Sequence, residues 1–350
     1  MLSAAPLPVI EGRYFQDVME QPRALRATLR WLREPGRWRE VSQFIAARRW
    51  TRIVLTGMGS SYHGFHPLNL ALIEAGHSPV MMETSELIYY GLGLCDEQTL
   101  VIAVSQSGAS AETVRLLELN RRSIVVGVTN TAGSPLARAA QLALLAQAGT
   151  EHSVSCKTYV SGMLILQWLA AIFSGRDEQE ALSRLQPCAD LAEQYLEGWR
   201  AKTETLATRL RGKRHLFLTG RGTSLSAVGT GALITKEAAR VHAEGMSSAA
   251  FRHGPMELQG ADMWIGVFSG DAATRGLNHR LVRDLVQSGA HCDEIGPGVA
   301  SAAFSLPECD ATLRPLLEIM PVQLMTLALA ALSGHEAGHF ERASKVTDTE

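Results

Sequence analysis

Cysteines are few and scattered in this sequence of 350 residues, which argues against a disulfide framework and against a cysteine-based zinc site. The five of them, Cys95, Cys156, Cys188, Cys292 and Cys309, contain no C-x-x-C pair. We therefore expect reduced thiols in a reducing compartment. The other ligand-type side chains lack metal spacing, so we expect neither a metal nor an organic cofactor.

The sequence also lacks an excess of either charge. Its 33 basic and 35 acidic residues give a net charge of −2, without the basic footprint of a nucleic-acid-binding protein. The N-terminus, "MLSAAPLPVIEGRYF", has no basic segment before an apolar core and does not read as a signal peptide. The apolar run "PVQLMTLALAALSG" is about 13 residues long, short for a bilayer and typical of a buried helix. We expect a cytoplasmic protein with no membrane and no nucleic-acid partner.

What the sequence does contain is an internal repeat. The segment "RIVLTGMGSS" at residues 52–61 recurs as "HLFLTGRGTS" at residues 215–224, an offset of 163 residues. An offset near half the chain length predicts two copies of one domain and not a solenoid.

Each copy alternates apolar runs with helix-like segments. The runs include "LVIAVSQSG", "SIVVGVTN" and "MWIGVFSGD", and long helices are expected over residues 157–173 and 313–332. Residues 14–50 are also expected to be helical, with a break at Pro35-Gly36. Alternating strands and helices predict an α/β fold of two tandem domains, each a flavodoxin-like parallel sheet between two layers of helices.

A serine-rich loop, "SQSGAS", joins one buried strand to the next helix. Helix N-termini bind phosphate through backbone N–H groups without any lysine. Ser105, Ser107 and Ser110 would add hydroxyl donors, Gln106 would add an amide, and Gly108 would allow close approach of the backbone. The alternative is that these serines only cap the helix.

A second polar turn favours the phosphate interpretation. Ser60 and Ser61 follow the preceding strand, so two strand ends would face the crevice where open α/β sheets bind ligands. No P-loop is present, and neither "GMGSSY" nor "GRGTSL" completes G-x-G-x-x-G, so a nucleotide site is not expected. In the second copy Asp271 would repel an anion, and we expect that copy to contribute something else.

The sequence resembles the double sugar-isomerase (SIS) proteins over about residues 45–350. The resemblance rests on five motifs that occur in the family's order: "GMGSS", "SQSGASAET", "AGTEHSVSCKTY", "KEAARVHAEGMSSAAFRHGP" and "ASKVTDTE". The SIS proteins include the isomerase half of glucosamine-6-phosphate synthase and SIS-type glucosamine-6-phosphate deaminases. The resemblance implies a helical segment at 1–45, a phosphate-binding SIS domain at 46–180, a helical linker at 181–212, a second SIS domain at 213–335 and a C-terminal tail at 336–350 that completes the active site.

The resemblance also implies which residues bind the substrate. Ser61 and the serine loop (Ser105, Gln106, Ser107 and Ser110) match the family's phosphate-binding positions, with Ser60 beside them. Val154 and Ser155 match the segment that lines the sugar, and Glu151 matches a structural glutamate near it.

Three catalytic positions are implied in the same way. Glu237 matches the carboxylate that moves a proton between C1 and C2, and His253 matches a ring-opening histidine that family members lend across a dimer interface. Lys345 matches a tail lysine that contacts the open-chain sugar and can form a Schiff base. An imidazole suits ring opening near neutral pH. Without the resemblance, all three would read as solvated surface residues.

The sequence departs from the family around the sugar. Ile234 stands where a lysine precedes the catalytic glutamate, Ala109 and Ala250 replace common acidic residues, and Lys157 and Thr158 are exchanged in order. The residues expected to bind the phosphate therefore match the family, while the residues expected around the sugar differ from it.

These features predict an isomerase or deaminase that acts on an aminosugar 6-phosphate, uses or releases free ammonia and has no glutaminase domain. One alternative is a deglycase of an amine-linked ketose phosphate of the fructoselysine 6-phosphate type. The other is a non-catalytic sugar-phosphate-binding protein. We expect a homodimer with the active site shared across subunits.

Overall fold

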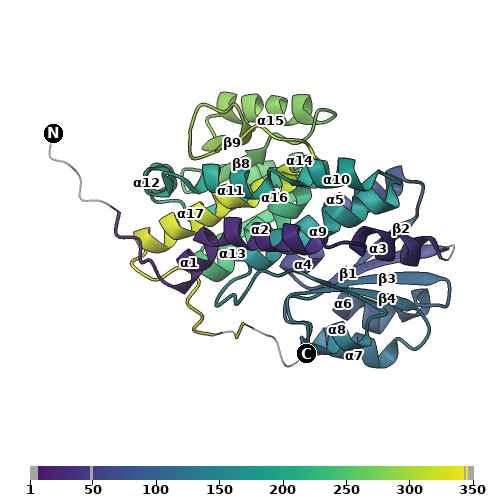
Figure 1. Cartoon of the computed structure of the whole chain (residues 1–350). Coiled ribbons are helices and arrows are strands. Elements are labelled where there is room, and N and C mark those ends of the chain that lie inside the picture. The colour runs from purple at the N-terminus through teal and green to yellow at the C-terminus, as the bar shows by residue number, and fades with distance from the viewer. Residues whose placement is uncertain (1–6, 48–49, 343, 346–350) are drawn as a thin grey trace. The chain divides into compact units, whose positions relative to one another are not determined.

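The computed structural model describes residues 7–47, 50–342 and 344–345 and contains two five-stranded sheets (Figure 1). All strand pairs are parallel. The chain divides into two compact units. The first-sheet unit contains residues 21–151 and 155–189 and the tail from Arg342; the second-sheet unit contains the chain up to Glu20 and residues 152–154 and 190–341. The predicted α/β class with helix-flanked parallel sheets is confirmed.

The first sheet has the strand order β2-β1-β3-β4-β5. Its strands are β1 (Arg52–Gly57), β2 (Pro79–Glu83), β3 (Thr99–Val104), β4 (Ile124–Thr129) and β5 (Leu142–Leu145). The central strands are buried on both faces, which explains their continuous Val, Ile and Leu runs. Gly57 is the register partner of Val104, so the turns that follow β1 and β3 lie side by side.

Helices cover both faces of this sheet; α7 and α8 lie on one side and α9 on the other (Figure 1). They are α2 (Gln21–Leu32), α3 (Arg37–Ala46), α4 (Ser60–His63), α5 (His66–Glu74), α6 (Thr84–Glu86), α7 (Ala111–Leu119), α8 (Pro135–Ala139), α9 (Lys157–Phe173) and α10 (Glu178–Leu185), with η1 (Leu87–Gly91) and η2 (Leu92–Leu94). Helix α9 has the predicted bounds. It is apolar all round because it packs against α2, α5 and the sheet.

The second sheet has the order β10-β9-β8-β6-β7. Its strands are β6 (His215–Gly220), β7 (His242–Ser247), β8 (Met263–Phe268), β9 (Cys292–Pro297) and β10 (Ser305–Leu306). Counted along the chain from β6, this order is the same as that of the first sheet. The shared order agrees with the predicted duplication.

The helices of the second-sheet unit include one long apolar segment. They are α1 (Arg13–Met19), α11 (Cys188–Leu196, which crosses the unit boundary), α12 (Trp199–Leu210), α13 (Leu225–Ala239), α14 (Ser248–Arg252), α15 (Arg275–Gln287), α16 (Arg314–Leu317) and α17 (Ile319–Leu332), with η3 (Gly222–Ser224) and η4 (Pro255–Leu258). The segment Arg314–Leu332 has 19 residues and a mean hydropathy of 1.7, so length and composition would allow it to cross a membrane. The segment matches the helix expected over residues 313–332, but its length shows that the inference of a segment too short for a bilayer was wrong. The segment is 94% buried, as in a core helix.

Two smaller predictions are confirmed. The helical region at residues 14–50 forms α1, α2 and α3, and the chain breaks between α2 and α3 at Gly36, where φ is +85°. The five cysteines are reduced thiols. The proposed domain boundaries stay a prediction.

A buried carboxylate on the second-sheet unit should make stability depend on pH. Glu318 is 1% exposed and accepts a hydrogen bond from Ser224 Oγ at 2.8 Å. Burial raises the pKa of Glu318 from 4.5 to about 7; Asp271 adds to this, and the Ser224 bond and Arg314 oppose it. A carboxyl with a raised folded-state pKa stabilises the fold below its unfolded pKa, and this stabilisation is lost as the pH rises through about 7.

We therefore expect Glu318→Gln to be more stable than the wild type by roughly 3 kcal/mol at about pH 8 and nearly equal to it at about pH 5. The amide resembles the protonated acid and does not ionise. Urea unfolding in phosphate-free buffer at both pH values measures the effect. An equal difference between the two proteins at both pH values would contradict it.

Candidate active site

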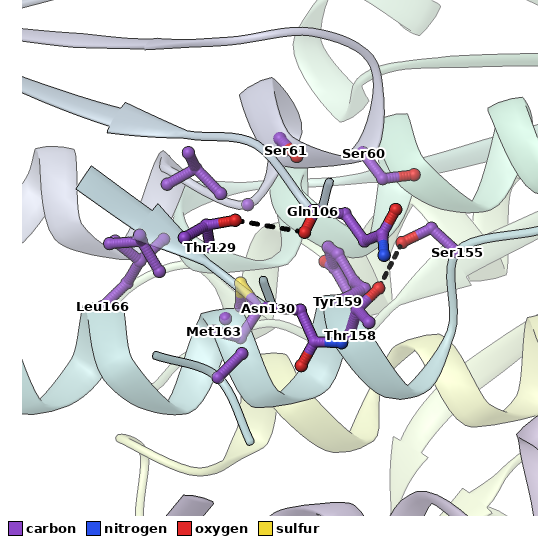
Figure 2. A pocket seen from close by; sticks show the side chains of 15 residues that line it. Ser60, Ser61, Gln106, Thr129, Asn130, Ser155, Thr158, Tyr159, Met163 and Leu166 are labelled. Atoms are coloured by element: carbon purple, nitrogen blue, oxygen red, sulfur yellow. Dashed lines mark hydrogen bonds between the residues drawn. The ribbon is translucent and has the colours of Figure 1, made fainter. Parts of the chain in front are cut away.

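A pocket of about 410 Å³, including its solvent-open part, lies at the carboxyl ends of β3 and β4 in the first-sheet unit. Its wall also includes the start of α4 and the first turns of α9 (Figure 2). Hydroxyl and amide side chains form one part of the wall: Ser60, Ser61, Gln106, Thr129, Asn130, Ser155 and Thr158. Apolar side chains form another part: Val104, Val128, Tyr159, Met163 and Leu166. The polar wall offers uncharged hydrogen-bond donors.

Gln106 is held by its backbone, which leaves its side chain to the pocket. The Gln106 carbonyl accepts bonds from Thr129 Oγ1 at 3.2 Å and from Asn130 N at 3.0 Å. Figure 2 shows the Gln106 amide extending toward Ser60 and Ser155. Ser155 Oγ lies 3.3 Å from Thr158 Oγ1. The strand ends, α4 and α9 thus direct polar groups into one space.

The three serines of the loop lie beside Gln106 but are not among the residues that line the pocket. Ser105 Oγ accepts the Gly108 N–H and Ser107 Oγ accepts the Ala109 N–H, both at 3.2 Å. Ser110 Oγ lies 2.8 Å from Thr113 Oγ1 and makes no capping bond to α7. A hydroxyl that accepts one bond still has its own hydrogen to donate. Their role in phosphate binding stays a prediction.

Gly108 is required by the backbone of this loop. Its φ is +63°, in the left-handed region that favours glycine. A Cβ there would stand 2.2 Å from Ser134 Oγ and 2.8 Å from Thr129 Oγ1. A side chain would therefore push the loop away from the end of β4.

The N-terminus of α9 is occupied by a protein carboxylate. Glu151 is 4% exposed, and its Oε1 accepts the N–H groups of Cys156 and Thr158, each at 2.9 Å. Its Oε2 accepts the Thr158 hydroxyl. A negative charge at this end of a helix is stabilised by the helix dipole. Glu151 therefore fixes Thr158 at the pocket wall.

Lys345 contacts the same carboxylate. Its Nζ lies 3.4 Å from Glu151 Oε2, and its side chain is 24% exposed. The tail is thereby joined to Thr158 through Glu151. Of the predicted site residues, Ser60, Ser61, Gln106 and Ser155 thus line the pocket, and Glu151 and Lys345 lie next to it. The tail beyond Lys345 is outside the described residues.

We expect Glu151→Ala to lower the free energy of unfolding by about 3 kcal/mol, because two buried N–H groups lose their acceptor. Lys345→Met should cost less than about 1 kcal/mol, because the ion pair is partly exposed and the carboxylate keeps its other donors. Urea unfolding of both variants measures the difference. An equal loss in both would show that the ion pair, and not the helix N–H groups, makes Glu151 important.

The other predicted catalytic residues belong to the second-sheet unit. Glu237 is half-buried on α13, one turn after the fully buried Ile234 and next to the exposed Lys236. His253 is exposed and follows α14. Val154, predicted to line the sugar, is 2% exposed in the second-sheet unit and is not among the pocket residues.

Sequence reasoning missed several pocket residues. Thr129 and Asn130 end the run "SIVVGVTN", and their polar character directly after a strand was the available signal. Asn130 also fixes the following loop through Gly149 O at 2.7 Å and Ala148 N at 2.9 Å. Lys157 and Thr158 stand in the opposite order from the family's. As a consequence Thr158 lines the pocket, whereas Lys157 is 1% exposed and is not among the pocket residues.

The chain resembles known proteins over most of its length. A family model described as "SIS domain" matches residues 47–172. The glutamine–fructose-6-phosphate aminotransferase [isomerizing] of Thermococcus kodakarensis is 32% identical over 338 residues, which is 92% of this chain and 55% of the relative. The chain spans about half the length of the curated relatives that it matches.

Two solved structures share the fold. The C-terminal domain of glucosamine-fructose-6-phosphate aminotransferase from Francisella tularensis has a TM-score of 0.80 at 19% identity, covering 94% of this chain and 98% of that one. Glucosamine-6-phosphate deaminase from Thermotoga maritima has a TM-score of 0.75 at 16% identity, with the same coverage.

The family match covers the first copy of the repeat, and a SIS domain in the second copy stays a prediction. Residues 47–172 match the SIS domain family, and the chain resembles the isomerase domain of glucosamine-fructose-6-phosphate aminotransferase.

Proposed function

We propose that this chain is a phosphosugar enzyme that interconverts an aldose and a ketose on an aminosugar 6-phosphate, with release or uptake of ammonia. The observation that carries the proposal is the pocket at the ends of β3 and β4, whose polar wall consists of uncharged donors. Such donors can hold a phosphate dianion without neutralising it. Among the relatives, the names of the aminotransferases and the deaminase refer to phosphorylated sugars.

The phosphate group would be bound by Ser60, Ser61 and Gln106, with the serine loop completing its hydrogen bonds. Lys345 would meet the sugar from the Thr158 side, because its Nζ already lies 3.4 Å from the carboxylate that positions Thr158. An ammonium there can hold negative charge on an enolamine- or enediol-like intermediate.

The chemistry needs two further groups. His253 would move a proton between the ring oxygen and O1, which opens the ring. Glu237 would then carry a proton from C2 to C1 of the open-chain aminoaldose while one proton of the C2 amine passes to O1, giving a ketimine at C2. Water adds at C2, the C2–N bond breaks, and ammonia leaves a ketose 6-phosphate. Glu237 is only half-buried, so the proton that it carries can exchange with solvent.

The exposed His253 suggests how the site is shared. The exposed His253 stands on a turn next to Gly254, whose positive φ of +132° favours glycine, and a second copy of the chain has access to this turn. We propose that His253 acts in the site of a partner subunit of a two-fold homodimer. A monomeric mass together with full activity would contradict this.

The test is a panel of hexosamine 6-phosphates, including glucosamine 6-phosphate and galactosamine 6-phosphate. Ammonia is measured by a coupled assay, and NMR in D₂O follows deuterium incorporation at C1. The proposal expects ammonia and a ketose 6-phosphate from at least one sugar. No ammonia and no deuterium exchange with any of them would contradict it.

A second candidate is a deglycase of an amine-linked ketose phosphate of the fructoselysine 6-phosphate type. It is favoured by Ile234, which is 0% exposed in the core where the family has a lysine, while Lys236 is exposed. Release of a free amino acid, and no ammonia from hexosamine phosphates, would select it. Tight sugar-phosphate binding with no reaction of either kind would indicate a binding protein instead.

A further inference from the structure

Buried polar atoms gather in the second-sheet unit at the carboxyl ends of β6 and β8. The Nε atoms of Arg221, Arg275 and Arg314 and the Oε2 atom of Glu318 are buried without a hydrogen-bond partner in the part of the chain that the structure describes. Arg314 is 8% exposed and Glu318 is 1% exposed. Buried polar groups nearly always have a partner, so these four atoms call for one.

Hydrogen bonds join the turn after β6, the loop after β8 and the Arg314–Glu318 turn. Arg221 directly follows β6, and Ser224, in the turn after it, donates to Glu318 Oε1 at 2.8 Å. Glu318 lies one helical turn after Arg314, whose Nη1 donates to the Gly270 carbonyl at 2.9 Å in the loop after β8. Arg275 opens α15 after the same loop.

The sheet register brings the two halves of the cluster together. Thr219 of β6 pairs with Val267 of β8, so the turns that hold Arg221 and Gly270 are neighbours. This is the place in the second sheet that the serine loop and Ser60 occupy in the first.

The charge of the cluster is positive. Asp271, expected from the sequence to repel an anion, uses its Oδ1 to accept the Thr274 N–H at 3.0 Å and the Thr274 hydroxyl at 3.1 Å. Burial raises the pKa of Glu318 to about 7, so near neutral pH part of it is uncharged. The three guanidinium groups carry three positive charges, and the two carboxylates, Asp271 and Glu318, carry at most two negative charges.

We propose that this arginine cluster, Arg221, Arg275, Arg314 and Glu318, binds a phosphate group. Guanidinium groups match the geometry of phosphate oxygens through paired N–H donors. A phosphate would supply acceptors for the three Nε–H groups, and protonated Glu318 would donate to one of its oxygens. This site binds through charge, whereas the pocket of the first-sheet unit binds through neutral donors.

The pH dependence follows from the groups that face Glu318. These are Arg314, Asp271 and the Ser224 hydroxyl. As the pH rises through about 7, Glu318 loses its donor hydrogen and gains a repelling charge. Affinity for phosphate should therefore be higher at about pH 6 than at about pH 8.

The test is calorimetric titration of the full chain with inorganic phosphate. It uses a Ser61→Asp background, in which anion binding by the first pocket should be about 10²- to 10³-fold weaker. Arg275→Gln and Arg314→Gln should each weaken phosphate binding by about 10- to 100-fold, because each removes a charged donor. Arg280→Gln, on an exposed position of α15, is the matched control and should bind like the background. Circular dichroism checks that each variant is folded.

The result decides the proposal in either direction. Loss in both arginine variants with retention in Arg280→Gln supports it, and Arg275→Gln keeps the test valid if Arg314→Gln does not fold. Competition by glucose 6-phosphate would identify a phosphate ester as the ligand, and its absence would identify free phosphate. Phosphate binding that is absent in the background, or unchanged in Arg275→Gln, overturns the proposal. Neither outcome depends on turnover, so failure here is distinct from failure of the proposed enzyme.

Discussion

Glu237→Gln should lower the turnover of an aminosugar 6-phosphate by about 10²- to 10⁴-fold while substrate binding is retained. The amide keeps the size of the side chain but cannot accept the C2 proton. Glu237 is half-buried on α13, so the exchange does not open a cavity in the core. Steady-state ammonia release measures turnover, and calorimetry with the same sugar measures binding.

The matched control for this experiment is Lys236→Gln, which changes an exposed charge beside Glu237 on the same helix. It should keep turnover within about threefold of the wild type, as surface changes usually do. Deuterium exchange at C1 should disappear in Glu237→Gln together with ammonia release. If exchange persisted while ammonia release was lost, Glu237 would not be the base for the C–H step.

Ser61→Asp should weaken the binding of a hexose 6-phosphate by about 10²- to 10³-fold. Two like charges about 4 Å apart cost about 4 kcal/mol at the effective dielectric constant of a protein surface. Ser61 lies on the pocket wall at the start of α4 and is half-buried, so an aspartate there places a carboxylate beside the phosphate.

Ser61→Asn separates charge from size in this test, because asparagine has the shape of aspartate without its charge. It should weaken binding by less than about tenfold. Calorimetric titration with glucose 6-phosphate compares the two variants. Equal affinities of Ser61→Asp and Ser61→Asn would mean that no phosphate lies near this wall.

The sequence predicted the parts of the fold that depend on local patterns. The runs at β3, β4 and β8 are buried on both faces and are therefore continuous in apolar residues. Helix α9 was predicted at Lys157–Phe173 because this segment is mostly apolar. Ser60, Ser61 and Gln106 were predicted as neighbours because adjacent parallel strands end at one edge.

Other parts depend on tertiary structure and could not be read in this way. Val154 stands next to Ser155 in the sequence, but Ser155 lines the pocket and Val154 does not. Thr158 reaches the pocket wall because Glu151 holds its backbone and hydroxyl. No local pattern connects Arg221, Arg275 and Arg314, whose segments come together through the pairing of β6 with β8 and the Arg314 bond to Gly270.

A crystal structure of the protein with glucose 6-phosphate tests the central claim most directly. We predict that the phosphate lies in the pocket at the ends of β3 and β4, with Ser60, Ser61 and Gln106 donors about 2.6–3.2 Å from its oxygens. A sugar phosphate bound elsewhere, with this pocket filled by solvent or by packed side chains, would contradict the account.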